Sequence, residues 1–169
     1  ERAHERGNLK TRIYAGMSLY DWKILNAKIK QVGRGDAWLR RGGLKEYVDG
    51  SLGSRTAAFF KPFEDTPLDS GFFVNKPEYL YRQIKSADSA GLQVMVHAIG
   101  DKAIHTLLNI FDRVAKENGE RDRRFRIEHA QHIHPDDIER FVSQRVIPSM
   151  QPYHTIDDGR WAEKIIGHK

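Results

Sequence analysis

The sequence predicts an α/β fold built on a parallel sheet, and three observations carry this prediction. Segments with strand periodicity alternate along the chain with segments whose apolar residues recur at helical spacing. Residues 92–97 form an apolar run typical of a strand buried on both faces, and residues 101–118 carry a long apolar helical stripe. Strands that alternate with helices form right-handed βαβ units, so we expect one layered domain.

The first strand is predicted at residues 9–15, where apolar side chains occupy alternate positions. The following helix has Ser18 as its N-cap and Asp21 in its first turn, and Gly33 ends it. Its apolar face is formed by Trp22, Leu25, Ile29 and Val32. The second strand is predicted at residues 44–48.

A glycine-rich loop at residues 49–56 follows the second strand, and a polar stretch with prolines occupies residues 61–76. Loops of this length inside a domain often bind ligands or act as lids. The next helix begins at Pro77 and ends at Gly91. The remaining predicted elements are a strand at 92–97, a helix at 101–118, a strand at 125–129, a short helix that begins at Pro135, and a strand at 146–150.

The composition excludes several kinds of site. Cysteine is absent, so disulfides, thiolate zinc sites and cysteine nucleophiles are ruled out. No apolar run is long enough to cross a bilayer, so we expect no membrane contact. The net charge of +5 raises the alternative of a nucleic-acid-binding domain. Because the densest basic run, residues 121–124, contains an acid, a solvated loop is favoured over a phosphate-binding patch, and no nucleic-acid partner is expected.

Polar side chains gather where the predicted strands end. His97 and His129 are the last residues of consecutive strands, and Lys45 lies within an earlier one. Parallel strands end at one edge of a sheet, which places the two imidazoles about one strand spacing apart. Each ring can offer one nitrogen to a metal while a neighbouring group orients the other nitrogen.

Side-chain alternation predicts which strand faces carry this site. His97 shares a face with Met95, and His129 shares one with Ile127. Both faces are predicted to line an interior. Glu128 is then predicted to point away from the histidines and to be structural.

Four motifs follow one another along the chain: residues 44–57 (LKEYVDGSLGSRTA), 96–101 (VHAIGD), 126–131 (RIEHAQ) and 149–154 (SMQPYH). Together they resemble the YtcJ-like branch, or family 3 type, of the amidohydrolase superfamily. The resemblance covers the chain from Lys45 to His154 and is looser before it. It implies a metal-dependent hydrolase on a TIM (β/α)8 barrel, with this chain supplying about strands three to seven.

The superfamily pattern implies roles for individual residues. There, divalent metals, usually zinc, are held by an HxH pair of the first strand, a carboxylated lysine or acid of the fourth, histidines of the fifth and sixth, and an aspartate of the eighth. Carried over, the metal ligands are Lys45, His97 and His129. The residues implied to border the substrate pocket are Gln151, His154, Arg55 and Asp49.

Two parts of that pattern lie outside this sequence. The HxH letters occur only at residues 132–134, after the sixth-strand motif, where a turn into the next helix is the better interpretation. The catalytic eighth-strand aspartate is expected outside the chain. A complete barrel needs about 250 residues, so we expect residues 1–169 to be one segment of a larger barrel domain.

The expected activity of that larger protein is hydrolysis of a C–N bond, other than a peptide bond, in a small amide or formamide. The segment alone is expected to be inactive, to bind zinc weakly or not at all, and to self-associate through open sheet edges. One alternative is a regulatory or signalling protein that uses the amidohydrolase fold without catalysis. Another is a self-contained open sheet with a phosphate-binding loop at residues 49–56, although the GxxxxGK[ST] pattern is missing.

Overall fold

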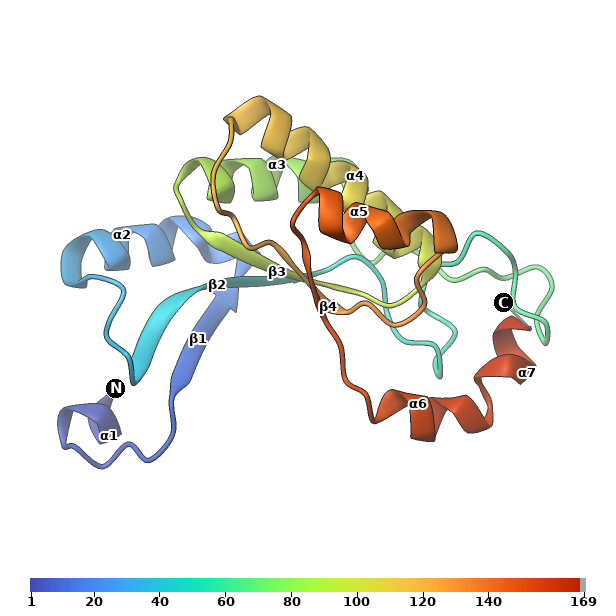
Figure 1. The fold of residues 1–169 in the computed structure, drawn as a ribbon, viewed down its shortest axis with the longest axis horizontal. Coiled ribbons are helices and arrows are strands. Elements are labelled where there is room, and N and C mark those ends of the chain that lie inside the picture. Colours follow the sequence, from blue (N-terminus) through green and yellow to red (C-terminus); the bar gives the residue numbers. More distant parts are fainter. Residues whose placement is uncertain (168–169) are drawn as a thin grey trace.

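A computed structural model describes residues 1–167 of the chain, which contain a five-stranded sheet. Figure 1 shows how the helices are arranged around it. The strands are β1 (Ile13–Ser18), β2 (Leu39–Tyr47), β3 (Gln93–Ala98), β4 (Arg126–His129) and β5 (Ile147–Ser149). They lie in the order β1-β2-β3-β4-β5, and every neighbouring pair is parallel. An order that follows the chain without reversal is that of a portion of a (β/α)8 barrel, whereas a doubly wound sheet reverses its order. The predicted α/β class is confirmed.

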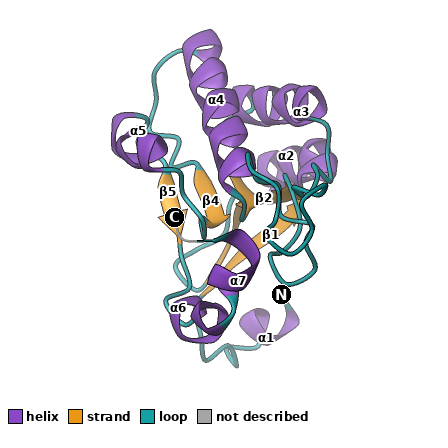
Figure 2. Ribbon diagram, turned by 90° about the vertical axis from the view of Figure 1, so that its right-hand side faces the viewer, coloured by secondary structure: helices purple, strands orange, loops and turns teal. Residues whose placement is uncertain are grey.

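Helices cover one face of this sheet. The α-helices are α1 (Arg2–Glu5), α2 (Trp22–Val32), α3 (Pro77–Ser89), α4 (Asp101–Asn118), α5 (Ile138–Ser143), α6 (His154–Asp157) and α7 (Ala162–Ile166). Short 3-10 helices are η1 (Leu19–Asp21), η2 (Pro135–Asp137) and η3 (Asp158–Arg160). In Figures 1 and 2, α2 to α5 form a layer on one side of the sheet, and α6 and α7 lie apart from it. The opposite sheet face is therefore free to carry polar groups.

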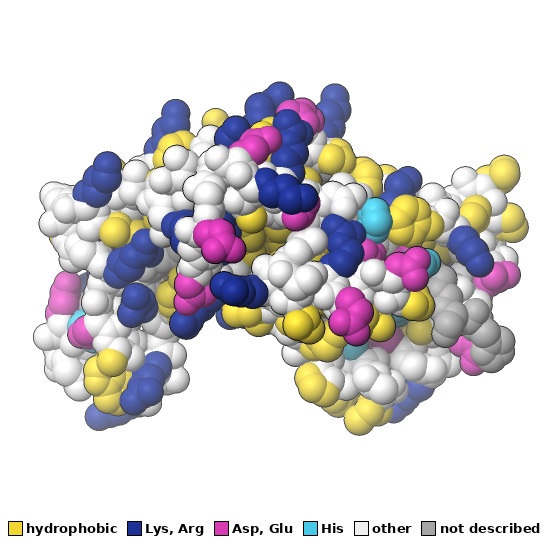
Figure 3. All heavy atoms as spheres, turned by 45° about the horizontal axis from the view of Figure 1, so that its top comes forward, with side chains coloured by type: hydrophobic (Ala, Val, Ile, Leu, Met, Phe, Trp, Pro, Cys, Tyr) yellow, Lys and Arg dark blue, Asp and Glu magenta, His cyan; other side chains and the backbone are white. Residues whose placement is uncertain are grey.

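The core lies between the sheet and the layer of α2 to α5. Leu44, Val96 and Ile127 of three adjacent strands are fully buried in one apolar cluster with the stripe of α4. Within this cluster the ring of Phe111 stacks on that of Phe125 at a centroid distance of 4.4 Å. Outside this core, basic and acidic side chains are intermixed over the helices (Figure 3), as on an ordinary solvated surface. No helix among residues 1–167 is long and apolar enough to span a bilayer.

The predicted orientation of β4 was wrong. Ile127 is fully buried against the helices rather than facing an interior. Arg126 and Glu128 therefore occupy the other face, where Arg126 Nε donates to Glu128 Oε1 at 2.8 Å. Glu128 also acts electrostatically on Lys45 of β2. The prediction failed because it extended strand alternation through His129, whose φ of 74° breaks it.

Two predicted boundaries also moved. β1 begins at Ile13 and extends to Ser18, whose hydroxyl accepts the N–H of Tyr20 and caps η1 rather than α2. β2 begins at Leu39, five residues before the predicted start at Leu44. The early part of β2 contains a pair of glycines and two arginines, so it lacks the apolar alternation that marks a strand. Both edge strands, β1 and β5, have one neighbour each, and self-association through them stays a prediction.

Glu117 joins α3 to α4 at the surface. Its carboxylate accepts from the Lys85 ammonium group at 2.6 Å, from the Tyr81 hydroxyl, and from Arg113 Nε at 3.1 Å. These hydrogen bonds, that of Lys85 first, lower the pKa of Glu117 from 4.5 to about 2. The stabilisation they provide is present above the unfolded-state pKa and is lost as the pH falls toward 2.

Replacing Glu117 by glutamine should therefore reduce stability at pH 7 and have a progressively smaller effect as the pH falls from 4.5 to 2. Urea unfolding of both proteins at pH 7, 4.5 and 3 measures this difference. Glu120→Gln, on the exposed loop after α4, is the matched control and should show no such trend. A Glu117→Gln difference that is equal at pH 7 and pH 3 would contradict this linkage.

Candidate functional site

His97 and His129 meet at the carboxyl edge of the sheet, as predicted from their positions in the chain. Their ring centroids lie 4.6 Å apart with an interplanar angle of 72°. The ring of His154, which begins α6, lies 6.1 Å from that of His129. Three side chains from the ends of β3 and β4 and from the segment after β5 are thereby brought together.

His97 is held in one orientation by the loop that follows β2. Its Nε2–H donates to the Gly50 carbonyl oxygen at 2.8 Å, and Asp49 Oδ1 lies 3.6 Å from the same nitrogen. Burial lowers the pKa of His97 to about 4. The nearby charges of His129 and Lys45 also lower this pKa, whereas the hydrogen bond to Gly50 raises it. The ring is neutral at pH 7, and among residues 1–167 its Nδ1 has no hydrogen-bond partner. A neutral ring with one anchored nitrogen is the form that binds metals.

His129 owes its position to an unusual backbone. Its φ is 74° and that of Ala130 is 44°, so two successive residues with side chains lie in the left-handed region. Such residues cost about 1 kcal/mol or more each and cluster at functional sites. The turn brings the ring beside His97, where Nδ1–H donates to Gln151 Oε1 at 2.8 Å. Gln151 is fixed in turn, because its Nε2 donates to the Ser149 carbonyl at 3.1 Å.

Lys45 approaches the histidines from β2. It is half-buried, and its Nζ lies 3.8 Å from the centroid of the Tyr47 ring. That ring lies 5.1 Å from the ring of His97. Burial lowers the pKa of the Lys45 amine, while Glu128 and Glu46 oppose the shift. The structure thus places Lys45 on the same sheet face as the histidines, one aromatic ring away from His97.

Asp49 lies behind His97 and is almost completely buried. Its carboxylate accepts the backbone N–H groups of Ala58, Ile99 and Gly100 at 2.9 to 3.0 Å. Burial raises the pKa of Asp49 to about 6, against these three hydrogen bonds. The carboxylate fastens the loop after β2 to the start of α4 and so supports the carbonyl that orients His97.

Gly100 completes this fastening and has no room for a side chain. A Cβ atom there would lie 2.1 Å from the Ala58 carbonyl oxygen, a backbone atom that cannot move aside. We expect Gly100→Ala to lower the free energy of unfolding by about 2 kcal/mol or more. Gly159→Ala is the control, because a Cβ atom at Gly159 would meet nothing within 4 Å, and its effect should stay within about 0.5 kcal/mol. Equal unfolding midpoints for the two variants in urea would contradict the argument.

Arg55 is not brought to the histidine pair. Its Nε donates to Asp65 Oδ1 at 3.0 Å, within the long loop before α3. The glycine-rich loop around it satisfies its own polar groups: Ser51 N–H donates to Thr56 Oγ1 at 3.0 Å, and the Ser51 and Ser54 hydroxyls lie 2.8 Å apart. Because these polar groups bond to one another, the loop forms a tight, internally hydrogen-bonded turn.

A cavity of about 410 Å³ adjoins His129 between the end of β4 and α6. Gln151 and His154 line it, as do Gln131 and Asp158. His154 Nδ1 lies 3.3 Å from Asp158 Oδ2, and the Gln131 amide donates to the same carboxylate. The sequence analysis did not name Gln131 or Asp158 as site residues. Gln131 ends the RIEHAQ motif, which was a signal for it, whereas nothing in the sequence singled out Asp158.

The residues present fit one part of a metal site. Two imidazoles lie side by side, each with one nitrogen anchored to an oxygen and the other without a hydrogen-bond partner among residues 1–167. Within the same residues, no group of three or more His, Cys, Asp or Glu side chains is placed to hold a metal ion. His134 Nδ1 accepts the N–H of Asp136 at the start of η2, which agrees with the predicted turn at residues 132–134. A zinc ion at this histidine pair would need further ligands, because zinc in proteins is usually four-coordinate.

A parallel sheet in chain order with histidines at its carboxyl edge defines a class: barrel-type α/β proteins whose site lies at the strand ends. A family model described as "Amidohydrolase family" matches residues 1–169. The chain belongs to the amidohydrolase family.

Individual relatives agree with this assignment. Protein LONG AFTER FAR-RED 3 of Arabidopsis thaliana is 44% identical over 145 residues, which are 86% of this chain and 25% of that protein. YtcJ of Bacillus subtilis, which bears an amidohydrolase name, is 36% identical over 126 residues, 75% of this chain and 23% of the relative. A solved structure titled an uncharacterized metal-dependent hydrolase from Pyrococcus furiosus has a TM-score of 0.83 and 33% identity, covering 99% of this chain and 34% of that one. The chain thus spans about a quarter to a third of the length of these relatives.

Proposed function

We propose that this chain is the central segment of the barrel of a longer hydrolase that cleaves C–N bonds in small amides or formamides with a divalent metal, zinc being the first candidate. The observation that carries the proposal is the pair formed by His97 and His129, with rings 4.6 Å apart. Each ring has one nitrogen anchored and the other open among the described residues, and both rings lie at the edge where barrel sites form. Membership of the amidohydrolase family supports it.

In this proposal His97, His129 and Lys45 hold the metal, together with ligands from outside residues 1–169. Lys45 would react through its neutral amine with CO2, forming an N–C bond and releasing one proton, to give a carbamate whose single negative charge is shared by two oxygens. A bound divalent metal supplies a water of lowered pKa and polarises the substrate carbonyl. Gly50 and Gln151 fix the ring orientations of His97 and His129, and Asp49 holds the Gly50 loop.

The substrate would occupy the cavity of about 410 Å³ beside His129, whose size suits a small molecule. Gln151 and His154 border it, so both can contact the amide group. Asp158 lies 3.3 Å from His154 and is placed to keep that ring in position. Arg55 is assigned to the outer loop, where Asp65 binds it.

The test uses the full-length protein encoded by the gene that contains this chain. Its hydrolysis of a panel of N-formyl and N-acetyl amines should cease after treatment with a chelator and return on addition of Zn²⁺ or Mn²⁺. A turnover rate that is unchanged after the metal has been removed, as verified by elemental analysis, would contradict the proposal.

Lys45 offers a separate prediction. Lys45→Ala should lower metal retention and turnover of the full-length protein by about 100-fold or more, because it removes an anionic ligand. Lys45→Glu, which supplies a carboxylate of its own, should retain more metal than Lys45→Ala. Lys61→Ala, on the exposed loop before α3, is the control and should keep the metal content and turnover of the wild type. Wild-type metal content in Lys45→Ala would exclude Lys45 as a ligand.

A second candidate is a regulatory role without catalysis, favoured by the 44% identity to LONG AFTER FAR-RED 3. The flanks of the full-length sequence discriminate between the two. An HxH pair upstream and a strand-end aspartate downstream supply the remaining ligands and the catalytic acid of a hydrolase. The lack of either group would favour the regulatory role.

A further inference from the structure

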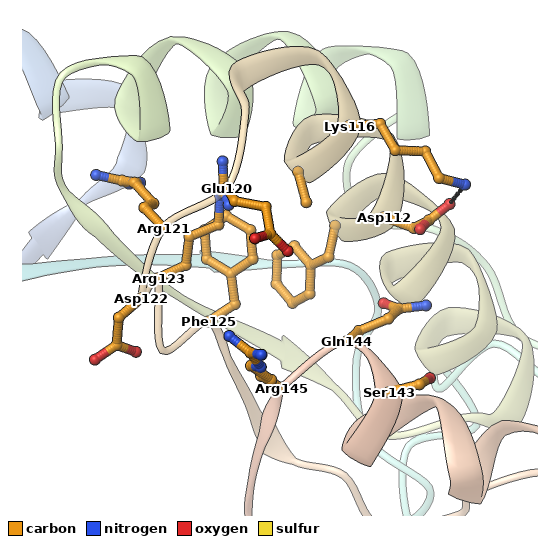
Figure 4. A pocket seen from close by; sticks show the side chains of 12 residues that line it. Asp112, Lys116, Glu120, Arg121, Asp122, Arg123, Phe125, Ser143, Gln144 and Arg145 are labelled. Carbon is orange, nitrogen blue, oxygen red and sulfur yellow. Dashed lines mark hydrogen bonds and ion pairs between the residues drawn. The ribbon is translucent and has the colours of Figure 1, made fainter.

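A second hollow lies at the opposite, amino-terminal edge of the sheet. Its volume is about 680 Å³, and the first or second residues of all five strands contribute to its lining. Six arginines, which we name the arginine cluster, surround it: Arg34, Arg40, Arg121, Arg123, Arg124 and Arg126. A smaller neighbouring hollow of about 280 Å³ shares Arg121 and Arg123 and adds Arg145 (Figure 4).

Carboxylates compensate only part of this charge. Buried Asp88 binds both Arg121 and Arg123, Glu128 binds Arg126, and Asp122 binds Arg124. Six guanidinium groups thus face three carboxylates.

Arg34 and Arg40 are the cations left over. Among residues 1–167, neither has a carboxylate within 4 Å. The Arg34 guanidinium donates only to the Gly91 carbonyl oxygen, at 2.9 Å, within the described part of the chain. The positive charges of both side chains are therefore available to a ligand.

The walls of the hollow are held in place by hydrogen bonds. The Tyr14 hydroxyl donates to Gln93 Oε1 at 2.8 Å, and Gln93 Nε2 donates to the Arg124 carbonyl oxygen at 2.5 Å. Arg34 and Tyr14 lie together over Gly42, where a Cβ atom would be 2.9 Å from Arg34 Nη1 and 3.0 Å from Tyr14 Oη. The charges of Arg34, Arg40 and Arg126 all act on the Tyr14 hydroxyl and oppose the rise in its pKa caused by burial. Arg34 thus lies beside Tyr14, and the charges of Arg40 and Arg126 act on the same hydroxyl group.

We propose that the arginine cluster binds a small phosphate-bearing anion, with Arg34 and Arg40 as its charge-neutralising contacts. Guanidinium groups present paired N–H donors that match phosphate oxygens, and a doubly charged ligand relieves repulsion between unpaired cations. The basic run at residues 121–124 alone indicated a solvated loop. In the folded chain Arg34 and Arg40, which precede this run by about 80 residues, line the same hollow. The run therefore forms one wall of a site. The site lies at the edge opposite the histidine pair and is independent of the proposed hydrolase function.

The proposal is tested by titrating the protein with inorganic phosphate or pyrophosphate, with chloride at the same ionic strength as the reference. Calorimetry measures the binding, and thermal unfolding measures the shift in the unfolding midpoint. The titrations use both the 169-residue chain and the full-length protein. Pyrophosphate should bind more tightly than phosphate, and Arg40→Gln should weaken its binding about tenfold. Arg34→Gln/Arg40→Gln should abolish it. The control is Lys28→Gln/Lys30→Gln on the exposed side of α2, which should bind as the wild type does.

The Arg40 side chain is exposed and makes no hydrogen bond or ion pair among the described residues, so Arg40→Gln tests binding without a loss of folding. Four outcomes would overturn the proposal. The first is a response to pyrophosphate no larger than that to chloride. The second is equal binding by wild type and the double arginine variant, and the third is binding by the 169-residue chain that disappears in the full-length protein. Tighter binding of duplex DNA than of pyrophosphate would instead assign the cluster to nucleic acid and would also overturn it.

Discussion

Asp49→Ala is expected to lower the free energy of unfolding by about 3 kcal/mol. The carboxylate is almost completely buried and accepts the N–H groups of Ala58, Ile99 and Gly100. Each donor left without a partner costs about 1–3 kcal/mol. Removing a buried charge recovers part of that loss, as the raised pKa of Asp49 indicates.

Urea unfolding at pH 7 measures this effect. Asp65→Ala is the matched control, because Asp65 binds an arginine but lies on an exposed loop. A surface ion pair of this kind contributes little to stability, because water solvates and screens both charges. Losses of equal size in the two variants would show that the Asp49 hydrogen bonds do not fasten the loop to α4.

The largest effect on activity is expected from His97→Ala and His129→Ala in the full-length protein. Each should lower turnover about a thousandfold or more, because the loss of a ligand removes several kcal/mol of metal-dependent stabilisation of the transition state. His4→Ala, on α1 and paired with Asp36, is the control and should keep wild-type turnover. Thermal unfolding of each variant separates a folding defect from the loss of a ligand. Folded His97 and His129 variants with wild-type turnover would remove the histidine pair from the mechanism.

Much of the fold could be predicted because its signals are local. The apolar run at residues 92–97 and the stripe of α4 identify β3 and its following helix, and both were found. The start of β2 was missed because glycines and arginines replace alternating apolar residues there. Tertiary pairing with β1, rather than local pattern, forms that part of the strand.

The site was predictable only in part. The positions of His97 and His129 at strand ends were sufficient to bring them together. The left-handed backbone at His129 was not predictable, because histidine and alanine carry no signal for it, and so Glu128 was assigned to the wrong face. The contact of His154 with Asp158 depends on the short helices after β5, and the arginine cluster depends on residues distant in sequence. Such long-range placements leave no periodicity to detect.

The central claim is that His97 and His129 bind a divalent metal in an amidohydrolase barrel. Elemental analysis of the purified full-length protein, as wild type and as His97→Ala and His129→Ala, tests it most directly. We predict at least about one equivalent of divalent metal in the wild type and less than about a tenth of that in each variant, since each change removes a ligand. Equal metal content in folded wild type and variants would contradict the claim.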